Sequence, residues 1–350
     1  MFGRIMNNYY YGKSGKGDFR KEDMPGTRMQ LFWDMLRVRL SGLCRINLLY
    51  ALIFLPMMVV IMLSVSNIYE NLNVYLMIHD NDYQAYAEQM KSAGAESMLT
   101  EAEFQELASQ EADIGKYLET SLQKMLLLLV PCIAITGPFT AGLSYVTRNW
   151  ARDEHAFIWS DFKDAVKENW KYSLVISCVT GFLPLAVFEG WIFYGQMATT
   201  NLIMFIPQIL VVMVGAIWSI SVTYMYPITV TYDLKLKGVL RNALLLAIAR
   251  LPFSVGIRLL HLVPLLIGFI AVWFFGLNLI VGLMILGGYY ILIGFALSRF
   301  ITASYTNAVF DRFINSRIEG AKTNRGMRIP DEDEDETGTI QEAAAEPGKE

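Results

Sequence analysis

Six long apolar stretches, separated by polar segments, dominate the pattern of the chain. Each is close to the roughly 20 residues that an α-helix needs to cross the hydrocarbon core of a bilayer. The pattern therefore predicts an all-α fold, a polytopic membrane helix bundle with six transmembrane helices. The spans are expected at about 46–64, 122–145, 172–194, 202–226, 253–275 and 277–297.

Three shorter stretches lie just before the first, third and fifth spans and carry apolar residues on one helical face and charges on the other. They predict cytoplasmic amphipathic helices at 29–43, 158–171 and 235–250. Such helices lie on the membrane surface or against a partner protein. The candidate partner-docking residues are Trp159, Phe162, Val166, Trp170, Leu240 and Leu244.

The segment between the first two spans is acidic, with eleven carboxylates against Lys91 and Lys116. Thr100 and Glu103 have the spacing of a capping box, which predicts a helix start near Glu101. We expect a small acidic helical hairpin outside the membrane. Its acids are most simply a solvated face, and a cation or partner surface is the alternative.

Orientation follows from lysine and arginine, which gather before the first span, in 147–171, in 227–258 and after Arg299. The hairpin and the short turns after the third and fifth spans are poor in them. We expect a multi-pass protein of the cell membrane with both termini cytoplasmic and an extracellular hairpin, whose first partner is the lipid bilayer. Nothing in the pattern suggests nucleic-acid binding.

The predicted organisation has six parts, and its last part ends in the acidic run Asp331 to Glu336, which is too polar to form a packed core. The leader contains GKSGKG, which is similar to part of a nucleotide-binding P-loop. Asn7 stands where such a loop needs its first glycine, so we do not predict a nucleotide site there. The parts are a cytoplasmic leader (1–28), an amphipathic helix with the first span (29–66), the acidic hairpin (67–121), spans two to four (122–226), an amphipathic helix with the last two spans (227–315) and a disordered acidic cytoplasmic tail (316–350).

An internal repeat is also predicted. Each amphipathic helix is followed at a similar interval by a proline within the next span, at Pro56, Pro184 and Pro264. The return spans share similar stretches at 138–141, 227–229 and 300–303. We interpret these as three parallel copies of an amphipathic helix plus a membrane hairpin. Coincidence in a chain rich in leucine and proline is the alternative.

The chain offers little sign of catalytic chemistry. His79, His155 and His261 fall in separate segments, and the three cysteines show no metal-ligand spacing, so we expect no enzyme, cofactor or metal site. Candidate solute contacts are Glu189, Trp191 and Tyr194 at the outer mouth, and Arg258 and His261 inside the fifth span. The alternatives are an interfacial aromatic belt for the two outer rings, a snorkelling Arg258 and a cross-helix hydrogen bond for His261.

Four stretches resemble the YesL family of membrane proteins, a family of unknown function found mainly in Firmicutes, which are Gram-positive bacteria. They are NYYYGKSGKGDFRKED in the leader, NLLYALIFLP in the first span, TGPFTAGLSYVTRNWARDEHAFIWSDFKDAVKENWKYS in the middle, and LRNALLLAIARLP before the fifth span. The resemblance covers most of 1–315, and the acidic hairpin and tail depart from it. Family genes typically neighbour carbohydrate ABC importers, so the resemblance implies a role in sugar or oligosaccharide uptake.

Two functions follow as hypotheses. The first is an accessory membrane subunit or scaffold for a carbohydrate ABC importer, which docks on the permease or ATPase through the amphipathic helices and meets the sugar only indirectly. The second is a stand-alone carrier or channel for a small neutral solute, which would not need charge near the middle of the membrane.

Overall fold

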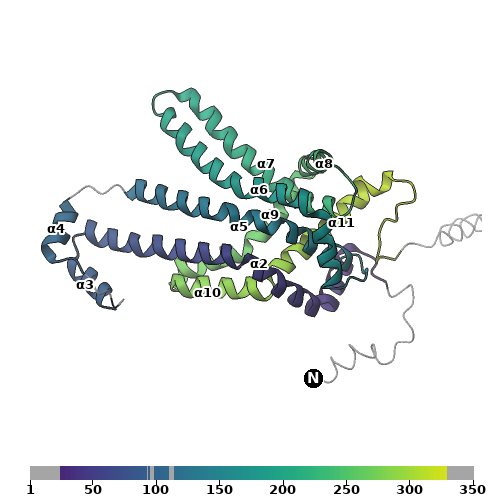
Figure 1. Cartoon of the computed structure of the whole chain (residues 1–350), viewed down its shortest axis with the longest axis horizontal. Coiled ribbons are helices and arrows are strands. Elements are labelled where there is room, and N and C mark those ends of the chain that lie inside the picture. Colours follow the sequence, from purple (N-terminus) through teal and green to yellow (C-terminus); the bar gives the residue numbers. More distant parts are fainter. Residues whose placement is uncertain (1–23, 93, 95–97, 110–113, 329–350) are drawn as a thin grey trace, which may run out of the picture.

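The computed structural model describes residues 24–92, 94, 98–109 and 114–328, and every regular element in them is helical (Figure 1). Most of the predicted leader and the acidic run of the tail lie outside these residues. The helices are α2 (Arg28–His79), α3 (Tyr83–Ser92), α4 (Glu101–Ser109), α5 (Ile114–Trp150), α6 (Ser160–Ala198), α7 (Phe205–Thr229), α8 (Leu236–Ala249), α9 (Leu251–Phe275), α10 (Leu279–Tyr289) and α11 (Phe295–Phe313). Three short helical turns also occur: η2 (Leu202–Met204) before α7, η3 (Tyr290–Gly294) between α10 and α11, and η4 (Asn315–Arg317) after α11.

Six segments among the described residues are long and apolar enough to cross a membrane: α2, α5, α6, η2 with α7, α9, and α10 through η4. The prediction of an all-α polytopic membrane bundle is therefore confirmed. The physical reason is that lipid offers backbone groups no hydrogen-bond partners, so each crossing segment must pair its own N–H and C=O groups as a helix.

Two of the predicted amphipathic helices are not separate elements. The first is continuous with the first span in α2, a helix of 52 residues that reaches His79 in the acidic segment. The second is continuous with the third span in α6. Only α8 stands alone, because the chain turns at Arg250 and Pro252 occupies the first turn of α9.

The acidic segment contains α3 and α4, at the far end of α2 from its start (Figure 1). The capping box is confirmed: the Thr100 backbone N–H donates to Glu103 Oε2 at 2.8 Å, and the Glu103 N–H donates to Thr100 Oγ1 at 3.4 Å. The hydrogen bonds that the Glu103 carboxylate accepts from the Thr100 backbone N–H and from the Thr100 hydroxyl lower the pKa of Glu103. Phe104 is fully buried against Tyr83 and Tyr86, so this segment has a small core of its own.

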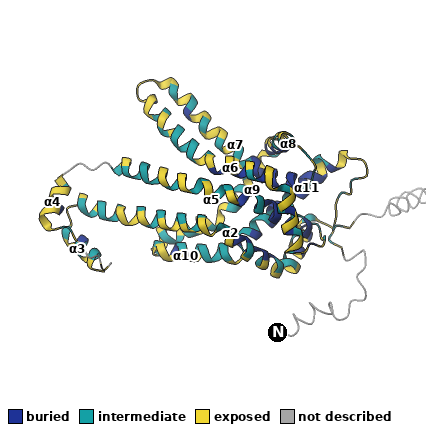
Figure 2. Cartoon of the chain, viewed as in Figure 1, coloured by how far each residue is buried: buried dark blue, intermediate teal, exposed yellow. Residues whose placement is uncertain are grey.

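Buried residues gather at the opposite end, which we call the base (Figure 2). There the start of α2, the end of α5, the start of α6, the end of α7, α8 and α11 meet around two apolar clusters. Beyond the base the helices expose apolar side chains, as at Phe275, which is 82% exposed. Lipid covers such surfaces in a membrane bundle.

The beginning of the predicted disordered tail is folded, which corrects the boundary at 316. Asp311 of α11 accepts hydrogen bonds from Arg28 Nη2 at 2.7 Å and from the Asn324 backbone N–H at 3.1 Å. The Arg328 N–H donates to the Pro25 carbonyl oxygen at 3.1 Å. Residues 316–328 therefore close against the start of α2, because these specific bonds outweigh the polar composition that predicted disorder.

Helices α5 and α6 meet at Gly137 and Pro138. Pro138 has no N–H, which leaves the Ala134 carbonyl without its helical donor, and Ser177 Oγ of α6 donates to that oxygen at 2.6 Å. A Cβ on Gly137 would come within 2.2 Å of Ser177 Oγ and 2.3 Å of the Ser173 carbonyl oxygen. Glycine therefore permits the close approach through which α6 satisfies the backbone group freed by the proline.

The three return spans share one local feature. Thr140, Thr229 and Thr302, which occupy matching places in the predicted repeat, each donate a hydrogen bond to the carbonyl oxygen four residues earlier, at 2.8, 2.8 and 2.9 Å. The arrangement is consistent with the repeat, which stays a prediction.

Replacing Gly137 by valine tests the α5–α6 contact. Because backbone and Ser177 fill the space beside Gly137, we expect Gly137→Val to lower the free energy of unfolding by about 1–3 kcal/mol. Gly268→Val is the matched control, since a Cβ at Gly268 of α9 would meet nothing within 4 Å. Thermal unfolding of the purified chain in neutral detergent measures both, and equal midpoints for the two variants would contradict the packing described here.

Candidate binding site within the membrane bundle

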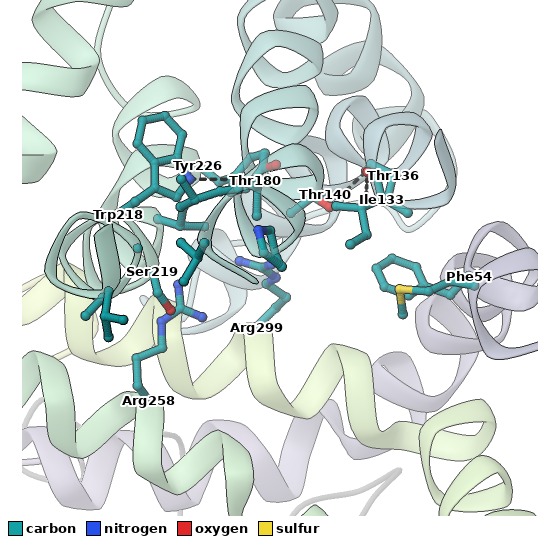
Figure 3. A pocket seen from close by; sticks show the side chains of 18 residues that line it. Phe54, Ile133, Thr136, Thr140, Thr180, Trp218, Ser219, Tyr226, Arg258 and Arg299 are labelled. Atoms are coloured by element: carbon teal, nitrogen blue, oxygen red, sulfur yellow. Dashed lines mark hydrogen bonds between the residues drawn. The ribbon is translucent and has the colours of Figure 1, made fainter. Parts of the chain in front are cut away.

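A cavity of about 590 Å³ lies between the α6–α7 hairpin and helices α2, α5, α9 and α11 (Figure 3). Its two ends differ in chemistry. Toward the base it is lined by Arg258 and Arg299, and away from the base its walls are apolar. The apolar wall residues are Phe54, Met57, Ile133, Leu183, Val187 and Val212.

The two arginines also line a second, smaller cavity of about 160 Å³, which adds Tyr50, His261 and Tyr290 to its walls. Arg258 rises from α9 and Arg299 from α11, and both side chains point into the larger cavity in Figure 3. The guanidinium groups therefore stand where the two cavities adjoin.

Neither arginine has an acidic partner among the described residues. No Asp or Glu of the described chain lines either cavity. The Nε atom of Arg258 is buried and has no hydrogen-bond partner there, and Arg299 stacks over the Tyr226 ring at 5.4 Å from its centroid. Charged groups within a membrane span are costly and normally pair with one another or face water, so two unneutralised cations are an unusual feature.

The position of Arg299 depends on a π-turn held by Asn47. The five residues of η3 interrupt the last span, and such a turn leaves backbone groups without their usual helical partners. Asn47 Nδ2 of α2 donates to the Tyr290 and Ile291 carbonyl oxygens at 2.8 and 2.7 Å, and its Oδ1 accepts from the Ala296 N–H at 2.8 Å. One side chain thus fixes the rotation with which α11 leaves the turn.

Several hydroxyl groups around the cavities are already engaged, although Thr223 Oγ1 in the smaller cavity is buried without a partner among the described residues. Tyr50 and Thr140 share a hydrogen bond of 2.6 Å, and Trp218 Nε1 donates to Thr180 Oγ1 at 3.0 Å. His261 Nε2 lies 3.1 Å from the Ser298 carbonyl oxygen and 3.3 Å from Thr302 Oγ1, so the histidine bonds across from α9 to α11. The buried Nε of Arg258 and the Thr223 hydroxyl are thus donors left without a partner among the described residues, and the two guanidinium groups carry the positive charge of the site.

The structure separates the predicted solute contacts into two groups. Arg258 and His261 line the cavities. Glu189, Trp191 and Tyr194 do not line them and lie near the far end of α6. There Trp191 is 50% exposed, and Oε1 of Glu189 is buried without a partner among the described residues. The five residues therefore do not form one site.

The predicted docking face of α6 needs a correction. Phe162 is buried, and a Cβ on Gly142 of α5 would meet Phe162 and Val166 at 3.0 and 2.7 Å, so these two side chains pack inside the protein. Trp159 and Trp170 are 63% and 47% exposed and remain on the surface. The buried face of α6 includes small residues such as Ala165 and Ser173, which a search for large apolar side chains does not weigh.

The predicted docking face of α8 also differs from the face that the structure exposes. The helix buries Val239, Ala243 and Leu246. Leu240 is half-buried in the base cluster, whereas Leu244 is exposed. Of the six predicted docking residues, Trp159, Trp170 and Leu244 are thus exposed.

Arg299 was missed by sequence reasoning, which treated it as the start of the basic cytoplasmic tail. In the structure α11 continues to Phe313, so Arg299 lies within a helix that is still packed against its neighbours. The available signal was the run of residues after it, Phe300 to Phe313, in which apolar and small residues recur with few charges.

Metal binding finds no support in the part of the chain that the structure describes. No three His, Cys, Asp or Glu side chains come together there in a group that could hold an ion. Its three cysteines are free.

A family model described as "Protein of unknown function, DUF624" matches residues 117–188 of the chain. The matched segment runs from α5 into α6 and includes the Gly137–Pro138 contact with Ser177. YesL-like proteins carry this family's domain, so the match supports the resemblance at that level. No curated protein and no solved structure matches the chain.

Replacing Asn47 tests the support of the cavity. Asn47→Leu leaves two carbonyl oxygens and one N–H at the π-turn without this partner, so we expect about 2 kcal/mol lower unfolding free energy. Asn71→Leu is the matched control, because Asn71 lies in the same helix and bonds only its own helix, at the Asn67 carbonyl. Unfolding in neutral detergent is the measurement. A loss for Asn47→Leu no larger than for the control would show that the π-turn does not depend on Asn47.

Proposed function

We propose that this chain is a carrier for a small anionic molecule that also has an apolar part, and that the molecule binds in the cavity beside Arg258 and Arg299. The observation that carries the proposal is the pair of arginines without an acidic partner among the described lining residues. A carboxylate or phosphate bound there would supply the missing negative charge and could accept a hydrogen bond from the unpartnered Nε of Arg258.

The apolar walls of the cavity support the proposal that the bound molecule also has an apolar part. Phe54 and Ile133 line the cavity away from the arginines, and an alkyl or ring group could occupy that end. On α7, Val212, Ala216 and Ser219 line the cavity and are also exposed. The cavity is thus open along that helix, which favours entry of an amphiphile from the lipid.

The sequence had favoured a neutral solute for a stand-alone carrier, because charge near the middle of the spans was scarce. Arg299 changes that argument. A neutral sugar would leave both guanidinium groups uncompensated in a low-dielectric site, which is costly. We therefore prefer an anionic ligand.

Substitution of the arginines tests ligand charge. In neutral detergent we expect dodecanoate to bind the chain and dodecanol, which has the same chain length without charge, to bind much less. Arg258→Gln or Arg299→Gln should weaken dodecanoate binding about tenfold or more, because each removes a charged hydrogen-bond donor. Native mass spectrometry counts the bound ligand.

Arg241→Gln is the control, because Arg241 is an exposed arginine on α8 outside both cavities. Equal binding of the acid and the alcohol, or equal loss in all three variants, would contradict an anion site at the two arginines. Proteoliposome counterflow of dodecanoate then separates a carrier from a receptor, since binding without flux would exclude carriage.

A second function is favoured by one specific observation, the exposed rings of Phe157, Trp159 and Trp170 at the base. Aromatic residues exposed in this way are typical of contact with a partner or with membrane headgroups. We propose that these rings dock an ABC permease or ATPase subunit on the cytoplasmic side, as the resemblance to YesL-like proteins implies. The base is assigned to that side because it carries the segments rich in lysine and arginine.

Affinity purification from native membranes tests this docking. We expect permease subunits to copurify with the wild-type chain and to be lost with the Trp159→Ser/Trp170→Ser double variant. Trp273→Ser is the control, because Trp273 is 74% exposed near the far end of α9. Recovery of the chain alone, or the same recovery with both variants, would count against an accessory role.

A further inference from the structure

A second basic pocket, of about 290 Å³, lies at the base, beyond the spans predicted from the sequence at 122–145 and 202–226. It forms where the end of α5, the turn after α7 and the folded segment after α11 meet. Its cationic lining residues are Arg148, Arg152, Lys322 and Arg325, and Thr231, Tyr232 and Asn315 add polar groups. The proposed carrier function does not use this pocket.

The acids near the pocket are already engaged. Glu154 forms an ion pair with Arg325. Asp311 accepts from Arg28 Nη2 at 2.7 Å, from Asn315 Nδ2 at 2.6 Å and from the Asn324 N–H at 3.1 Å. Positive charge is therefore in excess around the pocket.

Arg152 and Lys322 carry that excess. Neither forms an ion pair with an acid of the described residues, and Nη2 of Arg152 is buried there without a hydrogen-bond partner. Burial lowers the pKa of Arg152, and the nearby Asp311 and Glu154 oppose that shift. A buried donor without an acceptor costs free energy, which a bound anion would recover.

The pocket is also held in shape before any ligand arrives. Arg148 Nη1 donates to the Val230 carbonyl oxygen at 2.6 Å, and its Nη2 donates to Asn149 Oδ1 at 2.8 Å. On the other side, Gly326 has φ 76° and sits so close to Arg152 that a Cβ would lie 2.7 Å from the Arg152 carbonyl oxygen. Only glycine fits there, and it keeps the segment with Lys322 and Arg325 against Arg152.

We propose that this pocket binds a phosphate group. A phosphate offers up to two negative charges and several acceptor oxygens, which match one arginine and one lysine without acidic partners together with the polar groups beside them. The phosphate could belong to a soluble ion or ester or to the headgroup of an anionic lipid. Both sources present the same group to Arg152.

The test titrates two probes onto the purified full chain in neutral detergent: inorganic phosphate by calorimetry and short-chain phosphatidic acid by native mass spectrometry. The Arg258→Gln/Arg299→Gln background is used throughout, so that neither arginine of the membrane cavity contributes to binding. We expect at least one probe to bind. Arg152→Gln should weaken it about tenfold or more, and Lys322→Gln should weaken it several-fold.

Lys235→Gln, an exposed lysine at the start of α8 outside the pocket, should leave the affinity unchanged. Binding of inorganic phosphate points to a soluble source, and binding of phosphatidic acid alone points to a lipid headgroup. Absence of binding by both probes, or the same affinity in the Lys322→Gln and Lys235→Gln variants, would overturn the proposal. If Arg152→Gln disturbs folding, the comparison of Lys322→Gln with Lys235→Gln still decides whether the pocket binds the probe.

Discussion

The feature on which the rest of this structure depends is a pair of guanidinium groups inside the membrane bundle. No carboxylate of the described residues lines the cavities beside them. Moving an unpaired charge from water into a low-dielectric interior costs several kcal/mol. A protein folds with such a cost only if the rest of the bundle fixes the arrangement. The packing of the base and the polar bonds around the cavity serve that purpose.

The supporting structure works mainly by pairing backbone groups that regular helices would leave free. Ser177 bonds the carbonyl freed by Pro138, and Asn47 bonds the groups freed by the π-turn. Both side chains come from a neighbouring helix, so each irregularity becomes a specific contact between helices. These two contacts thereby fix how α6 and α11 approach the cavity, which is lined on one side by the α6–α7 hairpin.

Much of the fold could be predicted from sequence because bilayer thickness dictates the length of apolar runs. The capping box at Thr100 and Glu103 could also be predicted from the sequence, because it depends only on local spacing. Sequence reasoning was less reliable where small residues decide which face is buried. Phe162 was predicted to meet a partner, yet it packs inside because Gly142 lets α5 come close. The folding of 316–328 depends on bonds to Asp311 and Pro25, which composition does not reveal.

Only one of the two arginines of the candidate site was recognised from the sequence, for a related reason. Arg258 was recognised as an ionisable residue inside a span, whereas Arg299 was counted with the basic tail because a span of ordinary length ends near it. A helix that continues to Phe313 brings Arg299 back into the bundle. The juxtaposition of the two arginines depends on the register between α9 and α11, which no local pattern specifies.

The most direct test is to locate a heavy anion in crystals of the full chain soaked in bromide. The account predicts an anomalous peak in contact with the Arg258 and Arg299 guanidinium groups, and its loss in Arg299→Gln. A site without bromide, or one in which a carboxylate of the chain itself already pairs with the two arginines, would contradict it.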